Sequence, residues 1–329
     1  MNMPDITDHF NGIIQVKITM SFPLRWVNSY LLQGPEGLTI VDPGPRTPGN
    51  EEEWNKAFAE LGIGPSDIRQ IVLTHHHPDH LGCSGWLQEQ SGSRVWMSER
   101  SYREAQLMWG QGSAMNRDLP ALFRGHGMPE EWAGQLEAHL NGFISQVTPL
   151  PEVAFINAEQ PFAMGGRRWL PVETAGHAPG HLSFYHPESG DILCGDAVLP
   201  QISPNVSLMP GSDPEPLQSF LQGLLKLKNL EVGTAYPGHR NPFQHFGERL
   251  EALLLHHEER LAKIERLLAD APATGFELCV SLFGTKLGIH QMRFAMCETL
   301  AHTRELERRG RIGSGAGGDG VIRFSLTTS

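Results

Sequence analysis

The amino-acid sequence predicts an α/β protein in which helices cover layered sheets. Strand and helix patterns alternate through the first hundred residues, strand patterns return between residues 153 and 194, and helices dominate from residue 246. Such alternation is typical of folds built from packed layers of sheets and helices. With 329 residues and an apolar fraction of 40%, the chain can bury a large core in one or two domains.

The spacing of apolar side chains predicts the elements of the first hundred residues. Short apolar runs indicate strands over residues 13–18, 27–32, 38–41, 68–73 and 94–97. Helices are expected over residues 51–61 and 81–90. Trp54 and Phe58 recur at helical spacing in the first of these helices, so both are expected to lie in the core.

Residues 99–146 interrupt the alternation and predict two or three short helices. The segment is rich in methionine and tryptophan, and glycines and prolines punctuate it. Apolar stripes at helical spacing usually face a core, so the first interpretation is a helical excursion packed on the rest of the domain. The alternative is a lid over a binding site, because methionine and tryptophan suit an apolar ligand.

The second half of the chain predicts a further sheet and then a small helical domain. Strands are expected over residues 153–156, 168–172, 182–186, 191–194 and 234–236, with a helix over 216–227. Three helices over 249–268, 275–282 and 289–309 precede a glycine-rich hairpin over 311–326. Helices followed by a hairpin are typical of a winged helix, so we expect two domains, residues 1–245 and residues 246–329.

The charge balance argues against a general affinity for polyanions. The chain carries 37 acidic and 26 basic residues, and the whole acidic excess lies in residues 1–245. Nucleic acids and anionic membranes attract positively charged surfaces, so the sequence favours a small-molecule substrate.

The cysteines predict a reducing compartment. Cys83, Cys194, Cys279 and Cys297 form no CxxC pair, so no disulfide framework is expected. The N-terminal residues lack the pattern of a signal peptide, and no apolar run reaches the ~18 residues of a membrane span. We therefore expect a cytoplasmic protein that does not enter a membrane.

A dense histidine cluster follows the predicted strand over residues 68–73. His75, His77, Asp79 and His80 lie where this strand ends and a helix begins. Side chains two residues apart in extended backbone point the same way, so His75 and His77 share one side. Burying several imidazoles without a partner is costly, and the cluster therefore predicts a metal site.

Three further ligand-type residues occur at distant turns. His177, Asp196 and His239 each follow a predicted strand, and each is preceded by a glycine. Glycine allows the backbone to pass close to a bound metal. The repeated pattern predicts that all three residues join the histidine cluster.

In this order, the motifs resemble those of the metallo-β-lactamase superfamily of hydrolases, over about residues 10–245. The resemblance implies an αββα sandwich with a dinuclear metal site at one edge. It assigns His75, His77 and His177 to the first metal, Asp79, His80 and His239 to the second, and Asp196 to both. Asp42 fits the early acidic motif of the family and is expected to support a ligand from behind.

Two divalent ions imply a defined chemistry. Ions about 3.5–4 Å apart share a hydroxide and lower the pKa of water toward ~7, and one of them stabilises the oxyanion of the reaction. Asp79 is the expected catalytic acid or base. The histidine and aspartate donors suit zinc first, and iron or manganese next.

Two histidines beside the ligands, and two far from them, are expected to have lesser roles. His76 is expected to face away from the metals. His181 is expected to support a ligand from behind or to anchor a turn, with contact to the substrate as the alternative. His256 and His257 lie on a helix rich in charge and are expected to be solvated.

Residues 246–329 resemble the winged-helix-like domain of a branch of the superfamily related to a β-lactamase-like endoribonuclease. Basic and acidic residues are equal in number in this segment, whereas a nucleic-acid reader normally shows a basic stripe. Packing or homodimer contacts are therefore favoured over contact with nucleic acid.

The function expected from the sequence is hydrolysis of a carboxylic ester, a thioester or a lactone. The apolar excursion and the acidic balance favour such substrates. A phosphodiesterase or endoribonuclease is the first alternative, because of the C-terminal resemblance. An iron-dependent persulfide dioxygenase is the second, because such relatives keep the same metal motif.

Overall fold

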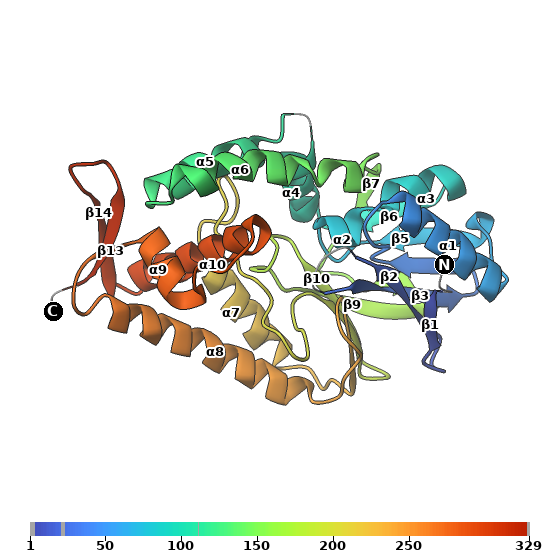
Figure 1. Cartoon of the computed structure of the whole chain (residues 1–329). Helices are drawn as coiled ribbons and strands as arrows, with labels where there is room; N and C mark the ends of the chain where they lie inside the picture. The colour runs from blue at the N-terminus through green and yellow to red at the C-terminus, as the bar shows by residue number, and fades with distance from the viewer. Residues whose placement is uncertain (1–3, 21–23, 111, 328–329) are drawn as a thin grey trace.

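The structure is a computed structural model that describes residues 4–20, 24–110 and 112–327 (Figure 1). Its first sheet has seven strands in chain order, β1 (Asp5–Asp8), β2 (Ile13–Thr19), β3 (Trp26–Gly34), β4 (Gly37–Val41), β5 (Ile68–Val72), β6 (Arg94–Met97) and β7 (Val153–Phe155). The strands from β1 to β4 pair antiparallel and those from β4 to β7 pair parallel. Parallel neighbours need crossover connections, and α1 (Pro48–Leu61) and α3 (Ser84–Ser91) lie in two of them.

The second sheet has five strands in the order β12-β11-β10-β9-β8. These strands are β8 (Phe162–Met164), β9 (Arg167–Glu173), β10 (Leu182–His186), β11 (Asp191–Gly195) and β12 (Thr234–Pro237). Strands β11 and β12 pair parallel, and α7 (Pro216–Leu227) lies in the crossover between them.

The two sheets pack face to face, and helices cover their outer faces. Tyr30 and Leu32 of β3 share a buried cluster with Trp169 of β9 and other residues of the second sheet. Leu31, between them in sequence, belongs instead to the cluster that contains Trp54 of α1. Successive side chains of a strand point to opposite faces, so the layers are helix, sheet, sheet and helix. The predicted αββα sandwich is confirmed.

Local signals in the sequence explain where α1 begins and how it supports the site. Thr47 caps the helix by accepting a hydrogen bond from the backbone N–H of Asn50 at 3.1 Å, and Pro48 occupies its first turn. The indole N–H of Trp54 donates to the carbonyl of Pro43 at 2.8 Å. This hydrogen bond connects the buried face of α1 with the segment that contains Asp42.

Residues 99–146 contain three helices, α4 (Glu99–Trp109), α5 (Ala114–Gly125) and α6 (Glu130–Asn141). Leu119 and Phe123 of α5 and Leu136 and Leu140 of α6 are fully buried in the main core. The excursion therefore packs on the rest of the molecule, as its apolar stripes indicate.

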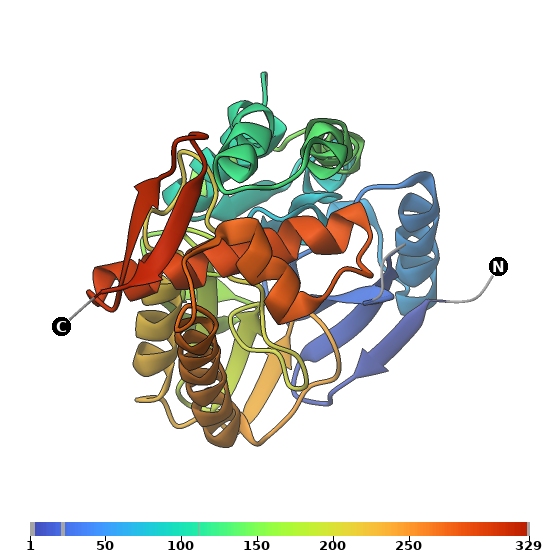
Figure 2. The ribbon, with the colours of Figure 1, turned by 60° about the vertical axis from the view of Figure 1, so that its left-hand side comes forward.

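The C-terminal part is built from α8 (Phe246–Leu267), β13 (Ala273–Thr274), α9 (Gly275–Phe283), α10 (Ile289–Arg308), β14 (Ile312–Ala316) and β15 (Ile322–Leu326). Its three strands form a small sheet in the order β13-β15-β14. Helix α10 packs against α6, α7 and α8 (Figure 2).

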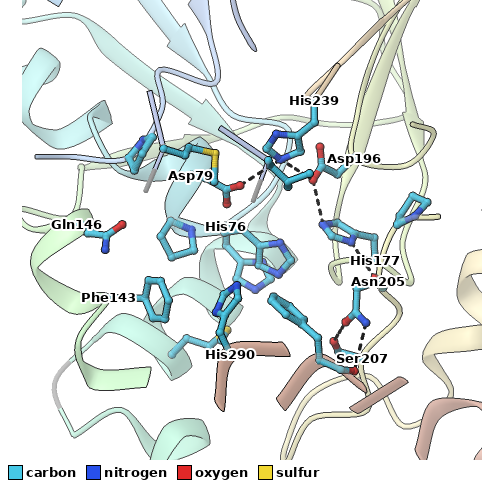
Figure 3. A pocket seen from close by; sticks show the side chains of 18 of the residues that line it. His76, Asp79, Phe143, Gln146, His177, Asp196, Asn205, Ser207, His239 and His290 are labelled. Carbon is cyan, nitrogen blue, oxygen red and sulfur yellow. Dashed lines mark hydrogen bonds and ion pairs between the residues drawn. The ribbon is translucent and has the colours of Figure 1, made fainter. Parts of the chain in front are cut away.

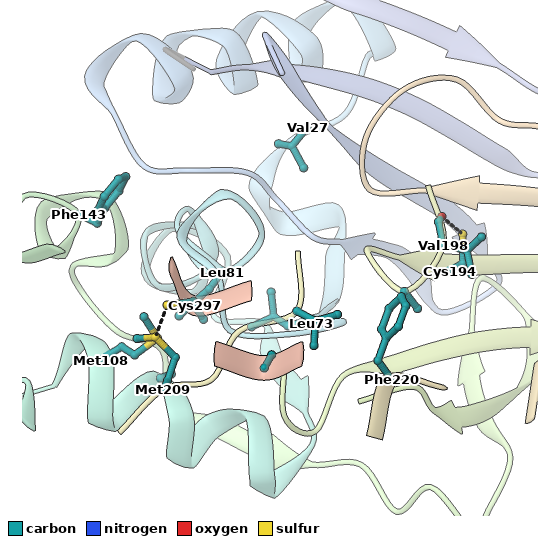
Figure 4. Packing of buried hydrophobic residues seen from close by; sticks show 14 of the residues in the cluster. Val27, Leu73, Leu81, Met108, Phe143, Cys194, Val198, Met209, Phe220 and Cys297 are labelled. Carbon is teal, nitrogen blue, oxygen red and sulfur yellow. Dashed lines mark hydrogen bonds between the residues drawn. The ribbon is translucent and has the colours of Figure 1, made fainter. Parts of the chain in front are cut away.

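A continuous apolar core joins this part to the sandwich. Figure 4 shows Met108 of α4 packed with Met209 and with Cys297 of α10, and the Sγ atom of Cys297 lies 3.5 Å from the Sδ atom of Met209. The domain boundary between residues 245 and 246 stays a prediction, and the core crosses it.

The structure differs from the sequence predictions at several elements. The helix expected over residues 81–90 is divided into α2 (Pro78–Leu81) and α3, because the backbone N–H of Cys83 donates to Gly44 rather than within one helix. The strands β1, β8 and β13 are absent from the predictions, because each has only two to four residues and shows no clear alternation. No helix in the described ranges is both long and apolar enough to cross a bilayer.

The prediction for His257 is wrong. His257 is fully buried on the inner face of α8, where its Nδ1 atom lies 3.0 Å from the Nε2 atom of His302 on α10. The packing of α10 buries this face of α8, and the charge pattern of α8 alone does not reveal it.

Candidate metal centre

The seven predicted ligands converge at one edge of the sandwich. His75 to His80 follow β5, His177 lies between β9 and β10, Asp196 follows β11, and His239 follows β12. Figure 3 shows Asp79, His177, Asp196 and His239 pointing toward one another. Strand ends that meet at one edge thus bring together side chains that are up to 164 positions apart in sequence, from His75 to His239.

The first cluster contains His75, His77 and His177, each with a ligand atom within 4.8 Å of those of the other two. The Nε2 atom of His75 lies 3.1 Å from the Nδ1 atom of His77. His177 donates from Nδ1 to the carbonyl of Asn205 at 2.8 Å, which leaves its Nε2 atom for the site.

The hydrogen bonds behind His75 fix its protonation. The single proton of the Thr74 hydroxyl goes to Asp42 at 2.6 Å, because a carboxylate can only accept. Thr74 must then accept from the Nδ1 atom of His75, at 2.9 Å. The Nε2 atom of His75 is therefore the unprotonated nitrogen, and its lone pair faces the cluster.

The second cluster contains Asp79, His80 and His239, again within 4.8 Å. His80 donates from Nδ1 to Asp42 at 2.9 Å, and His239 donates from Nδ1 to the carbonyl of Trp26 at 3.0 Å. Both imidazoles thus keep Nε2 for the site. Asp42 supports His80 from behind, where the family motif places it.

Asp196 lies between the two clusters. One carboxylate oxygen is 3.3 Å from the Nε2 atom of His239 and 3.6 Å from that of His177, and the other is 3.5 Å from that of His80. The residue is 5% exposed. A single carboxylate therefore reaches histidines of both clusters.

The donor set fits a divalent cation. Three buried atoms at the centre, Nε2 of His80, Nε2 of His177 and Oδ1 of Asp196, have no hydrogen-bond partner among the described residues. Buried polar atoms without a partner are costly, and a cation among them would satisfy all three. Imidazole nitrogens together with carboxylates are ordinary ligands of divalent transition metals.

Charge in the site agrees with this fit. Burial and the neighbouring imidazoles lower the pKa of His75 and that of His77, so both rings are neutral, as ligation requires. Burial also opposes a charge on His239, but the carboxylates of Asp196 and Asp79 outweigh it and raise its pKa to about 10. In the metal-free chain, protons on such histidines balance the carboxylates, and a bound cation would take the place of these protons.

His76 and His181 do not join the clusters. The Nδ1 atom of His76 lies 3.4 Å from the hydroxyl of Ser101, and its carbonyl accepts from the indole of Trp109. His181 accepts the backbone N–H of Asp196 on Nε2 at 3.1 Å and contacts the hydroxyl of Thr174 at 2.8 Å. His181 therefore anchors the turn that presents Asp196, as the sequence predicts.

A cavity of about 570 Å³ opens from the metal centre. Asp79 and Asp196 lie at its floor, and Met108, Trp109 and Met115 of the excursion line its wall. Helix α10 of the C-terminal part contributes His290, Arg293 and Phe294. Residues 99–146 thus pack on the core and also line the cavity. They combine features of the two interpretations drawn from the sequence, a packed helical excursion and a cover over a binding site.

Sequence reasoning missed the residues that link this cavity to the C-terminal part. Asn205, whose carbonyl holds His177, donates from its side chain to Glu298 of α10 at 2.9 Å. Glu298 in turn pairs with Arg260 of α8. These residues lie far apart in sequence and belong to no motif, so only the fold reveals them.

Gly238 offers a direct test of the centre. A Cβ atom there would lie 2.2 Å from a carboxylate oxygen of Asp196 and 2.6 Å from His80. We expect Gly238→Ala to lower metal affinity and activity at least about tenfold, the scale for disturbing the support of a metal ligand. Metal content per chain and kcat/KM measure this. Gly247→Ala is the control, because its new Cβ meets nothing within 4 Å. Full metal content in Gly238→Ala would contradict the assigned centre.

Comparisons with known proteins agree with the geometry. A model of the metallo-beta-lactamase superfamily matches residues 24–239, and a model of the metallo-beta-lactamase-like C-terminal domain matches residues 261–327. "Probable metallo-hydrolase YqjP" of Bacillus subtilis (strain 168) is 27% identical over 309 residues, which are 92% of this chain and 94% of that protein.

Two crystal structures resemble the whole chain. A metallo-beta-lactamase family protein from Thermus thermophilus is 34% identical, with a TM-score of 0.84, over 96% of this chain and 99% of that one. A beta-lactamase domain protein from Burkholderia ambifaria is 28% identical, with a TM-score of 0.88, over 98% and 94%. Because the superfamily match spans most of the chain and every residue of both clusters, this protein belongs to the metallo-β-lactamase superfamily.

Proposed function

We propose that the protein hydrolyses a carboxylic ester, a thioester or a lactone of a small molecule, with two divalent ions in its centre. The observation that carries this proposal is the pair of ligand clusters, joined by Asp196, at the floor of a largely apolar cavity. The relatives named as metallo-hydrolases support the reaction class.

The clusters define the proposed ligands. His75, His77 and His177 would hold one ion, Asp79, His80 and His239 the other, and Asp196 both. The donors suit zinc best, with iron or manganese as alternatives. When bound, two such ions act as Lewis acids and lower the pKa of water enough to provide a nucleophile at neutral pH.

The residues of the chain orient the ligands and move protons. Asp42 and the carbonyl groups of Trp26 and Asn205 hold the far nitrogens of three histidines, so the near nitrogens keep one orientation. Burial would raise the pKa of Asp79, but the charges of His80 and His239 outweigh it and lower that pKa. Asp79 is therefore ionised and partly exposed in the cavity, and its carboxylate would accept the proton of the attacking water and pass it to the leaving group.

The cavity favours an acyl substrate over a nucleic acid. Of the described residues that line it, Arg293 is the only lysine or arginine, whereas a nucleic-acid groove carries several. All four cysteines are buried free thiols, which supports a reducing, cytoplasmic setting for the reaction.

A phosphodiesterase or endoribonuclease is the second candidate, because the C-terminal elements follow the order helix, strand, two helices and hairpin. We interpret this order as a winged helix, and its helix α10 packs against α6 and α7 and lines the cavity. That placement supports a role in shaping the cavity rather than in reading nucleic acid.

A substrate panel tests the proposal on the metal-loaded full chain. The panel contains p-nitrophenyl hexanoate, a hexanoyl thioester, a γ-lactone, bis(p-nitrophenyl) phosphate, single-stranded RNA and glutathione persulfide with oxygen. We expect kcat/KM on an acyl substrate to exceed that on the phosphodiester at least about a hundredfold, because the cavity is lined for weakly charged groups. Activity confined to the phosphodiester or RNA, or oxygen consumption with the persulfide, would contradict it.

A further inference from the structure

One cation lies in the cavity wall without an acidic partner. Arg293 of α10 lines the cavity and is 7% exposed. Among the described residues it forms no ion pair, and its buried Nε atom has no hydrogen-bond partner. The guanidinium packs on the aromatic ring of Phe294, whose centre lies 4.0 Å from the guanidinium carbon.

Other arginines on α10, or directly after its last residue, behave differently. Arg308 and Arg309 pair with Glu305, and Arg304 lies 3.8 Å from Glu307. Arg293 instead lines the cavity, away from any glutamate of the helix that could pair with it in the described structure. The acidic Glu104 also lines the cavity, but Arg100 and the hydroxyl of Ser212 already satisfy it.

The groups that face Arg293 do not neutralise it. Its titratable neighbours are Cys297 and His290 of α10 and His139 of α6. Burial raises the pKa of the Cys297 thiol to about 12, so this thiol is neutral, and the Nε2 atom of His139 lies 3.3 Å from the Nδ1 atom of His290. Burial, followed by the charge of Arg293, lowers the pKa of His290 to about 4, so this ring is neutral at neutral pH. The guanidinium charge is therefore uncompensated within the described part of the chain.

An uncompensated buried charge is costly, and such a cost is offset where a ligand brings the opposite charge. A guanidinium binds carboxylate and phosphate oxygens through paired N–H groups. We propose that Arg293 binds an anionic group of the substrate, a carboxylate or a phosphate, while the bond to be hydrolysed lies at the metal end of the same cavity.

This inference rests on the proposed function and narrows its substrate class. The substrate is a small ester, thioester or lactone that ends in one anionic group, because the described cavity wall offers one lysine or arginine. The C-terminal part thereby supplies the residue that selects the substrate, although every proposed metal ligand lies in the sandwich.

Binding measurements test the anion site without turnover. Isothermal titration of the metal-loaded full chain would compare hexanoate and hexyl phosphate with 1-hexanol. We expect the preferred anion to bind about 10- to 100-fold tighter than 1-hexanol, the scale of a hydrogen bond to a charged group. Arg293→Met should remove this difference, and Arg293→Lys should keep part of it. The anion that binds more tightly, hexanoate or hexyl phosphate, shows whether the anionic group of the substrate is a carboxylate or a phosphate.

Two further measurements separate a binding role from a structural one. Arg304→Met is the matched control, because Arg304 is half-exposed on the same helix. This substitution should leave anion binding unchanged. Arg293→Met should keep or raise Tm, since it removes a buried unpaired charge. A lower Tm together with unchanged hexanoate and hexyl phosphate affinity would overturn the proposal, and so would equal affinity for all three ligands in the parent protein.

A kinetic comparison distinguishes this inference from the proposed function. The p-nitrophenyl monoester of adipic acid should have a higher kcat/KM than p-nitrophenyl hexanoate, and Arg293→Met should lower the ratio of the two values toward one. If no ester is hydrolysed but anion binding depends on Arg293, the proposed function fails and the anion site stands. If both esters are hydrolysed with equal kcat/KM and Arg293→Met leaves the anion affinity unchanged, the proposed anion site is wrong and the proposed function stands.

Discussion

Replacing Asp196 by alanine should abolish one metal position and lower kcat/KM at least about a hundredfold. Loss of a group that only supports a ligand already costs about 10- to 100-fold, and Asp196 contacts histidines of both clusters directly. Its carboxylate also helps to hold the pKa of His239 high in the metal-free chain. Without Asp196, neither cluster keeps a complete set of ligands.

The measurement is metal content per chain together with kcat/KM on the best substrate of the panel. Asp118→Ala is the matched control, since Asp118 is exposed on α5 and pairs with Arg117 far from the centre. An Asp196→Ala protein with full metal content and parent activity would overturn the assignment of a shared ligand.

Acidification should destabilise the junction between α8 and α10 through His257 and His302. Burial, followed by the charge of the partner ring, His256 and Arg260, lowers the pKa of His257 to about 2. Burial also lowers the pKa of His302 to about 3. The hydrogen bond to the carbonyl of Glu298 and the charge of Glu305 oppose this shift, and the charges of Arg260 and His256 add to it. In the unfolded chain both groups titrate near the ordinary pKa of ~6.5.

The direction of the effect follows from proton uptake. At pH values between the low pKa values of the folded chain and the ordinary pKa of ~6.5, the unfolded chain binds more protons than the folded one. The free energy of unfolding therefore falls as pH drops below ~6.5. At pH 5 each histidine contributes a loss of about 2 kcal/mol, and the pair about 4 kcal/mol.

Denaturant unfolding at pH 7.5 and pH 5.0 measures this loss. The double variant His257→Leu, His302→Leu should lose about 4 kcal/mol less than the parent between the two pH values, because neither leucine takes up a proton. His245→Leu, at an exposed position, should follow the parent. Equal losses in the parent and the double variant would show that the buried pair does not control acid stability.

The sequence predicted which side chains meet at this edge of the sandwich because its signals are local. His75, His77, Asp79 and His80 stand together at one strand end, and the glycines before His177, Asp196 and His239 mark three more strand ends. The structure brings all of these residues to one edge. Asp42 was also predicted, and its two hydrogen-bonded neighbours explain its place behind the ligands.

The cavity could not be predicted in the same way. Arg293 and Phe294 belong to no motif, and they line the cavity because α10 packs beside α6 and α7. Asn205, between β11 and α7, also belongs to no motif, and its carbonyl reaches His177. The prediction for His257 failed for the same reason, since contact with α10 buries it. A helix pattern shows which residues share a face, but the partner of that face depends on tertiary packing.

Metal occupancy tests the central claim most directly. Crystals of the metal-loaded full chain, measured with X-rays just above and just below the absorption edge of the bound metal, would locate each ion by anomalous scattering. The proposed centre predicts two peaks, one among His75, His77 and His177 and one among Asp79, His80 and His239, with Asp196 adjacent to both. A single peak in fully loaded protein, or peaks away from these residues, would contradict it.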